Sequence, residues 1–390
     1  MTKVNDAMKD ISIYFKPVSI KDEIKPESLG ESIFIHDQNG FPEIDSKGVA
    51  IIYVPEFRNS DLSIEKENES FRDQLYQFNK GDNWMFSIYD LGTIAPGEKV
   101  EDTYFALSQA ISELVKKGVV PVIIGGSQDL TLACYKGFEC LEQMVNICAV
   151  DSCLDVGDPK DPLRADSFVS HLLMQRPCYL FNYANLGMQR PLVKRKEIEL
   201  FEKLYFDVCR LGELNSDYKL SEPYLRNSDI LSIDFKSIRN SETDPSIYDN
   251  ANGFYAEQIC QIAKYAGISD KMSCVGIFDV LPKQQTAASN LLAQIIWYFI
   301  DGMAQRVGDF PIGSKKNYTK FHVRLEDFQE DLVFYRSNKS DRWWLEVKYL
   351  TPDNNKYERH CLIPCDQKDY DNAMRNEIPN LWWKTLQKLS

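Results

Sequence analysis

The sequence predicts an α/β protein built on a mostly parallel central sheet, and three observations support this prediction. Short apolar runs rich in β-branched residues recur along the first three quarters of the chain. Segments in which apolar residues follow helical spacing lie between these runs. Continuous apolar strands separated by helices are typical of a parallel sheet that is covered on both faces. Several of the runs also end abruptly in polar residues, and the carboxyl ends of such strands are where sheets of this kind carry functional side chains.

The expected elements begin at Gly48, after a polar and proline-containing segment that we interpret as an extension wrapped around the domain. The run GVAIIYVPE at Gly48 predicts a buried strand. A regular alternation of strands and helices is then expected. The predicted strands are residues 87–92, 119–129, 145–155, 177–189, 229–239 and 272–282. The predicted helices are residues 70–78, 102–117, 130–139, 254–265 and 287–305.

This rhythm stops after about residue 312. The runs LVFYRS, RWWLEVKYL and ERHCLIPC then suggest a small β-rich appendage, followed by a final helix. The expected division is an N-terminal extension at 1–47, a main domain at 48–312 and a C-terminal appendage at 313–390.

Four of the six tryptophans lie in the appendage, at Trp343, Trp344, Trp382 and Trp383. One interpretation is that they pack the appendage against the main domain. The alternative is a face that binds a protein partner, because aromatic side chains are favoured interface anchors.

Composition limits the classes of partner. The net charge of -13 argues against nucleic acid or an anionic membrane surface as the main partner. No apolar run is long enough to span a bilayer, and the N-terminal residues MTKVNDAMKDISIYF lack the apolar core of a signal peptide. We therefore expect a soluble, cytoplasmic protein without membrane insertion. The ten cysteines lie mostly in apolar segments without a CxxC pair, which fits reduced, buried thiols.

Three polar clusters stand at the ends of predicted strands. They read GGSQD from Gly125, DSCLD from Asp151 and SIDFK from Ser232, and the last is followed by an Asp-Pro pair at residues 244–245. A fourth cluster, FDVLP, contains Asp279. Each has a purely structural interpretation as well: the aspartates can cap helices and the glycine pair can form a tight turn.

The order and spacing of these clusters resemble the arginase, agmatinase and formimidoylglutamase superfamily, whose motifs read GGDHS, DAHxD and SxDxDxxDP. The resemblance covers roughly residues 48–310, and four motifs in order make it specific. It implies a three-layer arginase-like fold with a central sheet of about eight strands. It also implies two Mn²⁺ ions held by two histidines and four aspartates. These ions activate a hydroxide that attacks a guanidinium or formimino carbon.

The resemblance divides the metal ligands into retained and lost positions. Asp151, Asp155 and Asp234 match ligands of the family. Gln128 stands where the family has its first histidine, and with the three aspartates it would form a remnant single site. Such an all-oxygen set suits Mn²⁺, Mg²⁺ or Ca²⁺.

More ligand positions of the second metal site are substituted. Cys153 stands at the second histidine and Lys236 at the last aspartate of the family pattern. A protonated lysine cannot bind a metal, and carboxylates nearby favour its protonated form. We therefore expect the Lys236 ammonium to replace the second ion as the charge that offsets the aspartates. Asp279 stands at the acid that orients the substrate, where the family has the longer glutamate.

These substitutions predict a pseudoenzyme: an arginase-superfamily protein that has lost the binuclear manganese centre, binds no cofactor and serves as a structural or interaction subunit. By analogy with the family it would form a homo-oligomer. The alternative is a formimidoylglutamase-like hydrolase of linear amidines, either formimino or guanidino compounds, that uses a single metal and Asp279. A third reading is a binding protein for a small cationic or amide ligand. A nucleophilic pair of Cys153 and His171 is a fourth, less favoured reading.

Overall fold

The computed structural model describes residues 11–19, 23–62, 69–281, 287–312, 314–326, 331–348 and 355–389. The expectation about a signal peptide falls largely on residues 1–10, which lie outside these ranges. Within the described ranges, no helix is both long enough and apolar enough to cross a membrane.

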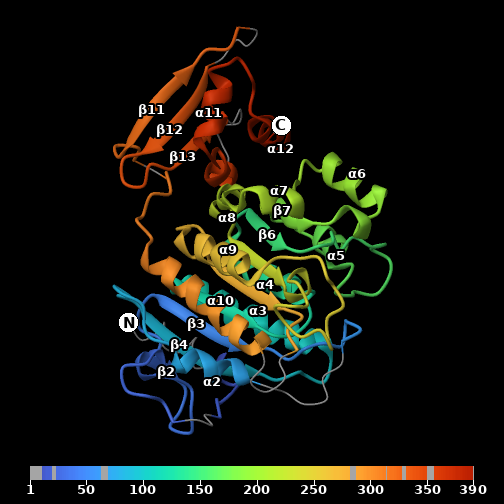
Figure 1. Ribbon diagram of the computed structural model, residues 1–390, viewed down its shortest axis with the longest axis vertical. Coiled ribbons are helices and arrows are strands. Elements are labelled where there is room, and N and C mark those ends of the chain that lie inside the picture. The colour runs from blue at the N-terminus through green and yellow to red at the C-terminus, as the bar shows by residue number, and fades with distance from the viewer. Residues whose placement is uncertain are drawn as a thin grey trace.

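A ten-stranded sheet forms the centre of the molecule (Figure 1). Its strands follow the order β1-β4-β3-β5-β10-β9-β6-β7-β8, with β2 also beside β4. Among the described strands of this sheet, only β1 and β4 pair in antiparallel orientation. The bounds are β1 (Phe15–Lys16), β2 (Ile33–Ile35), β3 (Gly48–Tyr53), β4 (Ser87–Ile94), β5 (Val119–Ile124), β6 (Val145–Val150), β7 (Leu180–Met188), β8 (Asp207–Arg210), β9 (Ile230–Asp234) and β10 (Cys274–Phe278).

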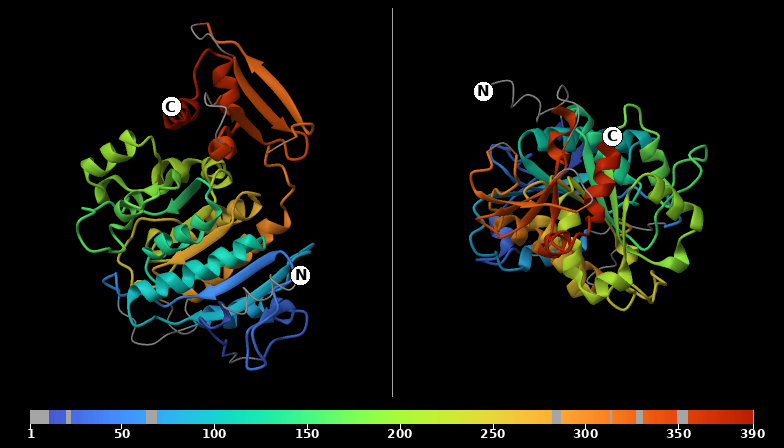
Figure 2. Two further views of the ribbon diagram at one scale, coloured as in Figure 1. Left: turned by 180° about the vertical axis from the view of Figure 1, so that it is seen from behind. Right: turned by 90° about the horizontal axis from the view of Figure 1, so that it is seen from above.

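Helices cover both faces of this sheet, so the predicted fold class is confirmed, with ten strands where about eight were expected (Figures 1 and 2). One apolar core lies under α2 (Ser70–Gln77), α7 (Leu211–Ser216), α8 (Glu222–Arg226), α9 (Ala256–Ile268) and α10 (Ala287–Ala304). The other core lies under α3 (Val100–Lys116), α4 (Leu130–Gly137), α5 (Phe168–Leu173) and α6 (Arg195–Lys203). β5 shows why the strands are apolar throughout: Val122 packs into the first core and Ile123 into the second.

A buried ion pair links strand β4 to helix α2. Asp90, fully buried in β4, accepts hydrogen bonds from Arg72 Nε at 2.7 Å and from the Tyr76 hydroxyl at 2.7 Å. Arg72 and Tyr76 both lie on α2. The charges therefore satisfy each other where β1 and β2, from the N-terminal part of the chain, complete the sheet beside β4.

The C-terminal part forms a separate four-stranded antiparallel sheet in the order β11-β12-β13-β14. Its elements are β11 (Tyr318–Val323), β12 (Leu332–Ser337), β13 (Trp343–Glu346), β14 (Leu362–Cys365), α11 (Gln367–Ala373) and α12 (Asn380–Leu389). Trp343, Trp344 and Trp382 are buried inside this appendage, whereas the Trp383 side chain on α12 is 48% exposed.

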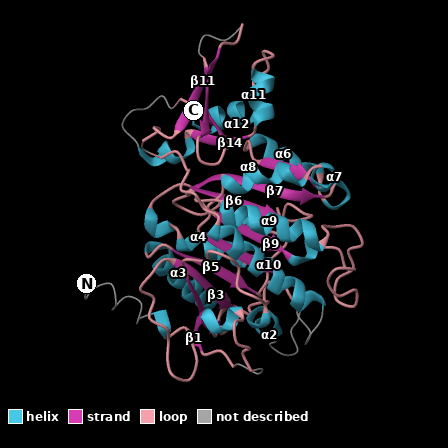
Figure 3. Cartoon of the chain, turned by 60° about the vertical axis from the view of Figure 1, so that its left-hand side comes forward, coloured by secondary structure: helices cyan, strands magenta, loops and turns pink. Residues whose placement is uncertain are grey.

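The appendage packs on the amino ends of the central strands, and Figure 3 shows β14 and α12 close to α8. Arg226 on α8 donates hydrogen bonds of 2.9 Å to the carbonyls of Trp343 and Cys365, and its guanidinium lies 4.6 Å from the Trp344 ring centroid. Lys384 on α12 pairs with Asp207, the first residue of β8, at 2.9 Å. The appendage therefore sits at the end of the sheet opposite to the carboxyl ends of the strands.

Candidate functional site at the carboxyl ends of four strands

The four polar clusters converge on one edge of the sheet. Gln128 follows β5, Asp151 follows β6, Asp234 ends β9 and Asp279 follows β10. These four strands are adjacent and parallel, in the order β5-β10-β9-β6. Because carboxyl ends of parallel strands meet at one edge, the fold gathers side chains that are far apart in the sequence.

The glycine pair after β5 turns the chain toward α4. Gly126 has φ +73°, and a Cβ atom there would lie 2.2 Å from a Leu130 methyl carbon and 2.7 Å from the Val54 carbonyl oxygen. Only glycine fits this turn.

Asp129, three residues after this glycine, is fully buried and stabilises the fold through hydrogen bonds. It accepts hydrogen bonds from the hydroxyls of Ser127 and Tyr104 and from the Asn59 amide at 3.0 Å. Burial raises the pKa of Asp129, and these three donors oppose that rise. The motif alone did not reveal these contacts, because Asn59 and Tyr104 lie in other segments of the chain.

Gln128 is buried and engaged with the neighbouring strand. Its side-chain amide donates to the Ser232 hydroxyl at 3.4 Å, and Ser232 in turn contacts the Thr131 hydroxyl at 2.7 Å. The backbone N–H of Gln128 donates to Asp279 Oδ2 at 3.3 Å. Gln128 thus joins β5, β9 and β10.

The carboxylates of Asp151 and Asp234 each accept a backbone N–H from two residues further along the chain. Asp151 Oδ1 accepts the backbone N–H of Cys153 at 2.8 Å, and Asp234 Oδ1 accepts that of Lys236 at 2.8 Å. Each aspartate therefore fixes the turn that follows its own strand.

The carboxylates also interact with one another. Asp155 has a positive φ of 47°, and its carboxyl group interacts with that of Asp151. Burial, followed by the charge of Asp151, raises the pKa of Asp155 well above its usual range. Burial raises the pKa of Asp234 as well, although Lys236 opposes that effect. The site therefore concentrates negative charge that only protons or a cation can offset.

Lys236 supplies a cation at this point. Its Nζ atom lies 3.4 Å from Asp279 Oδ2 and 3.9 Å from Asp234 Oδ2, while 42% of its side chain remains exposed. Burial alone would lower the pKa of Lys236, but the charges of Asp234 and Asp279 outweigh it and raise this pKa above its ordinary value. The amine therefore stays protonated at neutral pH.

Asp279 is fully buried. Its exposure is 0%, and burial raises its pKa to about 6 although Lys236 opposes this. Asp279 Oδ1 has no hydrogen-bond partner among the described residues. The Tyr248 hydroxyl donates to the Asp279 carbonyl at 2.9 Å and accepts the Leu281 N–H at 2.9 Å, which holds the turn where Asp279 has φ 56°. Tyr248 was not singled out from the sequence, although it follows the Asp-Pro pair by three residues.

Cys153 is not activated as a nucleophile. Burial, followed by the charge of Asp151, raises its pKa to about 11, so the thiol is protonated at neutral pH. The described residues contain no hydrogen bond between Cys153 and His171, and His171 Nε2 is buried without a partner.

No group of three or more His, Cys, Asp and Glu side chains is placed to hold a metal ion within the described ranges. None of the ten cysteines forms a disulfide bond in the described structure.

Comparison with known proteins identifies similar sequences and folds. Residues 61–235 match the model of the arginase family. A sequence search of curated proteins gave no match. The structure of formiminoglutamase from Trypanosoma cruzi with Mn²⁺ is 17% identical, covers 67% of this chain and 95% of its own, and superposes with a TM-score of 0.60. Formimidoylglutamase from Bacillus subtilis is 16% identical, with coverage of 77% of this chain and 99% of its own and a TM-score of 0.61.

Residues 61–235 are therefore similar to the arginase family, and the chain shares the fold of these two enzymes.

Proposed function

We propose that this chain is a non-catalytic member of the superfamily, in which Lys236 replaces the second metal ion and the protein acts as a structural or interaction subunit. The observation that carries the proposal is the position of the Lys236 ammonium, 3.4 Å from Asp279 and 3.9 Å from Asp234. A binuclear centre needs an acid at this place in the family pattern, and the chain has a fixed positive charge there.

The other two substituted positions support the same conclusion. A metal-bound cysteine must be a thiolate, whereas in the chain without metal burial raises the pKa of Cys153 to about 11 and keeps it a protonated thiol. The Gln128 amide is neutral and already donates to Ser232. Neither Cys153 nor Gln128 supplies a basic imidazole, which the family pattern has at both positions.

The alternative is a hydrolase of a formimino or guanidino compound that uses one metal. Asp151, Asp155, Asp234 and Gln128 would bind that metal, and an oxygen set of this kind fits Mn²⁺, Mg²⁺ or Ca²⁺. One observation favours it: Asp279 Oδ1 is a buried acceptor without a described partner, and an amidine N–H would satisfy it. The two similar structures carry the names of formiminoglutamases, which gives formimidoylglutamate as the first substrate to test.

Metal content after incubation with excess Mn²⁺ tests the two candidates. The natural chain is compared with the variant Gln128→His, Cys153→His, Lys236→Asp, with Lys116→Asp as a control at an exposed lysine. The proposal expects no bound ion in the natural chain, no formimino or guanidino hydrolysis, and Mn²⁺ uptake only by the triple variant. One ion per natural chain together with turnover establishes the alternative, and two ions overturn both.

We also propose that contacts with a partner protein or with a second copy of the chain involve α12. Of the four tryptophans in the appendage, Trp383 is the exposed one, and aromatic side chains anchor interfaces. Light scattering of the natural chain and of Trp383→Ala tests the homo-oligomer. A lower mass for the variant supports the proposal, whereas an unchanged oligomer removes Trp383 from the interface.

A further inference from the structure

A cavity of about 460 Å³ lies between the main domain and the appendage, far from the aspartate site. β8, α7 and α8 form one wall, and β14, α11 and α12 form the other. Its volume falls within the usual range of small-molecule sites. Both walls are already held in place, because Arg226 binds β13 and β14 and Lys384 binds Asp207. The cavity therefore needs no closing motion before a ligand enters.

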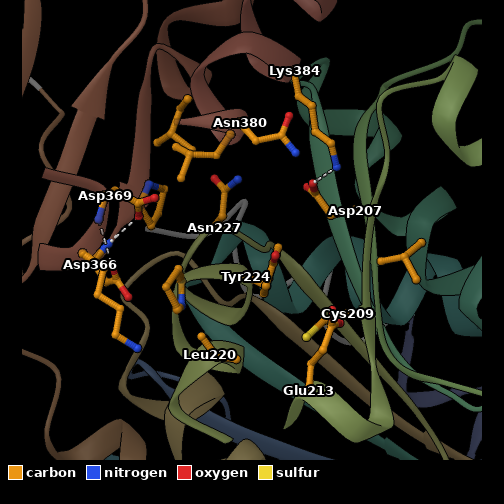
Figure 4. A pocket seen from close by; sticks show the side chains of 16 residues that line it. Asp207, Cys209, Glu213, Leu220, Tyr224, Asn227, Asp366, Asp369, Asn380 and Lys384 are labelled. Atoms are coloured by element: carbon orange, nitrogen blue, oxygen red, sulfur yellow. Dashed lines mark hydrogen bonds and ion pairs between the residues drawn. The ribbon is translucent and has the colours of Figure 1, made fainter. Parts of the chain in front are cut away.

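Carboxylates stand at two separated ends of this cavity. Figure 4 shows Asp366 and Asp369 at one side and Glu213 with Asp207 at the other. Asp366 and Asp369 begin α11, where each accepts the other's backbone N–H at 3.0–3.1 Å. Glu213 Oε2 accepts the Arg210 N–H at 2.7 Å. These bonds fix the carboxylates in position and leave part of their hydrogen-bonding capacity unused.

The cations of the lining do not balance these acids. The lining contains four carboxylates and two lysines, a difference of two negative charges. Lys384 is paired with Asp207 at 2.9 Å. Lys368 is 71% exposed and lies 3.7 Å from Asp217, which is outside the lining. Asp369 and Glu213 therefore have no ion pair with a lysine or arginine in the described structure, and burial raises the pKa of Asp369 to about 6.

The space between the two ends combines apolar surface with unused polar groups. Leu220 and Leu381 face the cavity from opposite walls. The Asn227 and Asn380 amides and the Tyr224 hydroxyl lie between the carboxylates in Figure 4, and none of them forms a side-chain hydrogen bond with the described residues. An aliphatic stem would contact the leucines, and ammonium groups at its ends would meet the acids.

We propose that this interdomain cavity binds a linear aliphatic diamine, with one ammonium at Asp366 and Asp369, the other at Glu213, and the alkyl chain between Leu220 and Leu381. The ligand would touch both walls and so strengthen the attachment of the appendage.

Calorimetric titration of the full chain with a series of α,ω-diaminoalkanes tests this site. Alkylamines of the same chain lengths serve as probes with a single charge. We expect affinity to peak at one chain length, and the best diamine to bind at least about tenfold more tightly than its monoamine. Saturation that does not depend on length, equal affinity for the monoamine, or no saturable binding would overturn the proposal.

Two variants locate the binding. Asp369→Asn and Glu213→Gln remove one charge from opposite ends and keep an oxygen that can accept the helix N–H bond. Each should weaken the diamine by about tenfold and leave the monoamine less affected. Asp371→Asn, on the exposed side of α11 outside the lining, is the matched control and should bind like the natural chain. Thermal unfolding checks that all three variants are folded. Natural affinity in both cavity variants would contradict the assignment.

Discussion

Replacing Lys236 by methionine should destabilise the protein at neutral pH, because it removes the cation from a group of buried acids. The Coulomb energy of a pair at 3.4 Å is about 5 kcal/mol at an effective dielectric constant of ~20 and about 1 kcal/mol in water. The Lys236 side chain is 42% exposed, so solvent screening places the loss between these limits, and we expect about 2 kcal/mol.

The pH dependence has a definite sign. The pKa of Asp279 is about 6 in the folded chain against 3.8 ordinarily, so the folded state binds the proton more tightly. The stability that comes from protonated Asp279 is therefore complete below pH 3.8 and is lost as the pH rises through about 6. Without Lys236 the folded pKa moves higher and this loss grows. The gap between variant and natural chain should be widest at pH 7–8 and should narrow below pH 4.

Urea unfolding at several pH values measures the gap. Lys116→Met is the matched control, because Lys116 is 45% exposed and pairs at 2.7 Å with a single surface acid, Glu113. The control should lose less than about 1 kcal/mol at every pH. Equal losses in the two variants, or a Lys236→Met variant as stable as the natural chain at pH 7, would refute the role assigned to Lys236.

Three further predictions concern the frame around the site. Burial lowers the pKa of His360 far below 6.5, so the unfolded chain binds the proton more tightly than the folded chain. The free energy of unfolding therefore falls as the pH drops below 6.5. The substitution His360→Asn should remove about 2 kcal/mol of this loss between pH 7 and 5, measured from urea unfolding midpoints. Arg226→Lys should cost about 2–3 kcal/mol, because one ammonium cannot reach both carbonyls and stack on Trp344, whereas Arg375→Lys on the surface should be neutral in the same assay. The substitution Gly126→Ala should lower the free energy of unfolding by more than about 2 kcal/mol, measured by thermal unfolding. The control Gly212→Ala, on α7 where a Cβ atom meets open space, should be neutral or stabilising. A Gly126→Ala variant as stable as the natural chain would contradict the turn geometry.

The parallel strands could be predicted because burial on both faces leaves a clear record in the sequence. β5, with six buried residues, is an example: apolar side chains are required on either side of it. β8 was not predicted, because Asp207–Arg210 is short, lies at the edge of the sheet and is largely half-exposed. β1 and β2 were also missed, since they are short pieces beside β4 whose pairing depends on tertiary contacts.

The candidate site could likewise be predicted only in part. The motifs at the strand ends predicted that Gln128, Asp151, Asp234 and Asp279 belong together, because strand order fixes that edge. Side-chain partners from other segments could not be predicted. The link from Asn59 to Asp129 spans 70 residues, and no local pattern records it.

The attachment of α12 bears on how the chain folds during synthesis. Lys384 and Lys388 on α12 bind Asp207 and Asn182 at the starts of β8 and β7. The partners lie 177 and 206 residues earlier in the chain. While a ribosome is still producing the appendage, these strands already exist and their amino ends have no cover. The amino ends of β7 and β8 therefore stay accessible during the interval between the synthesis of these strands and the synthesis of α12.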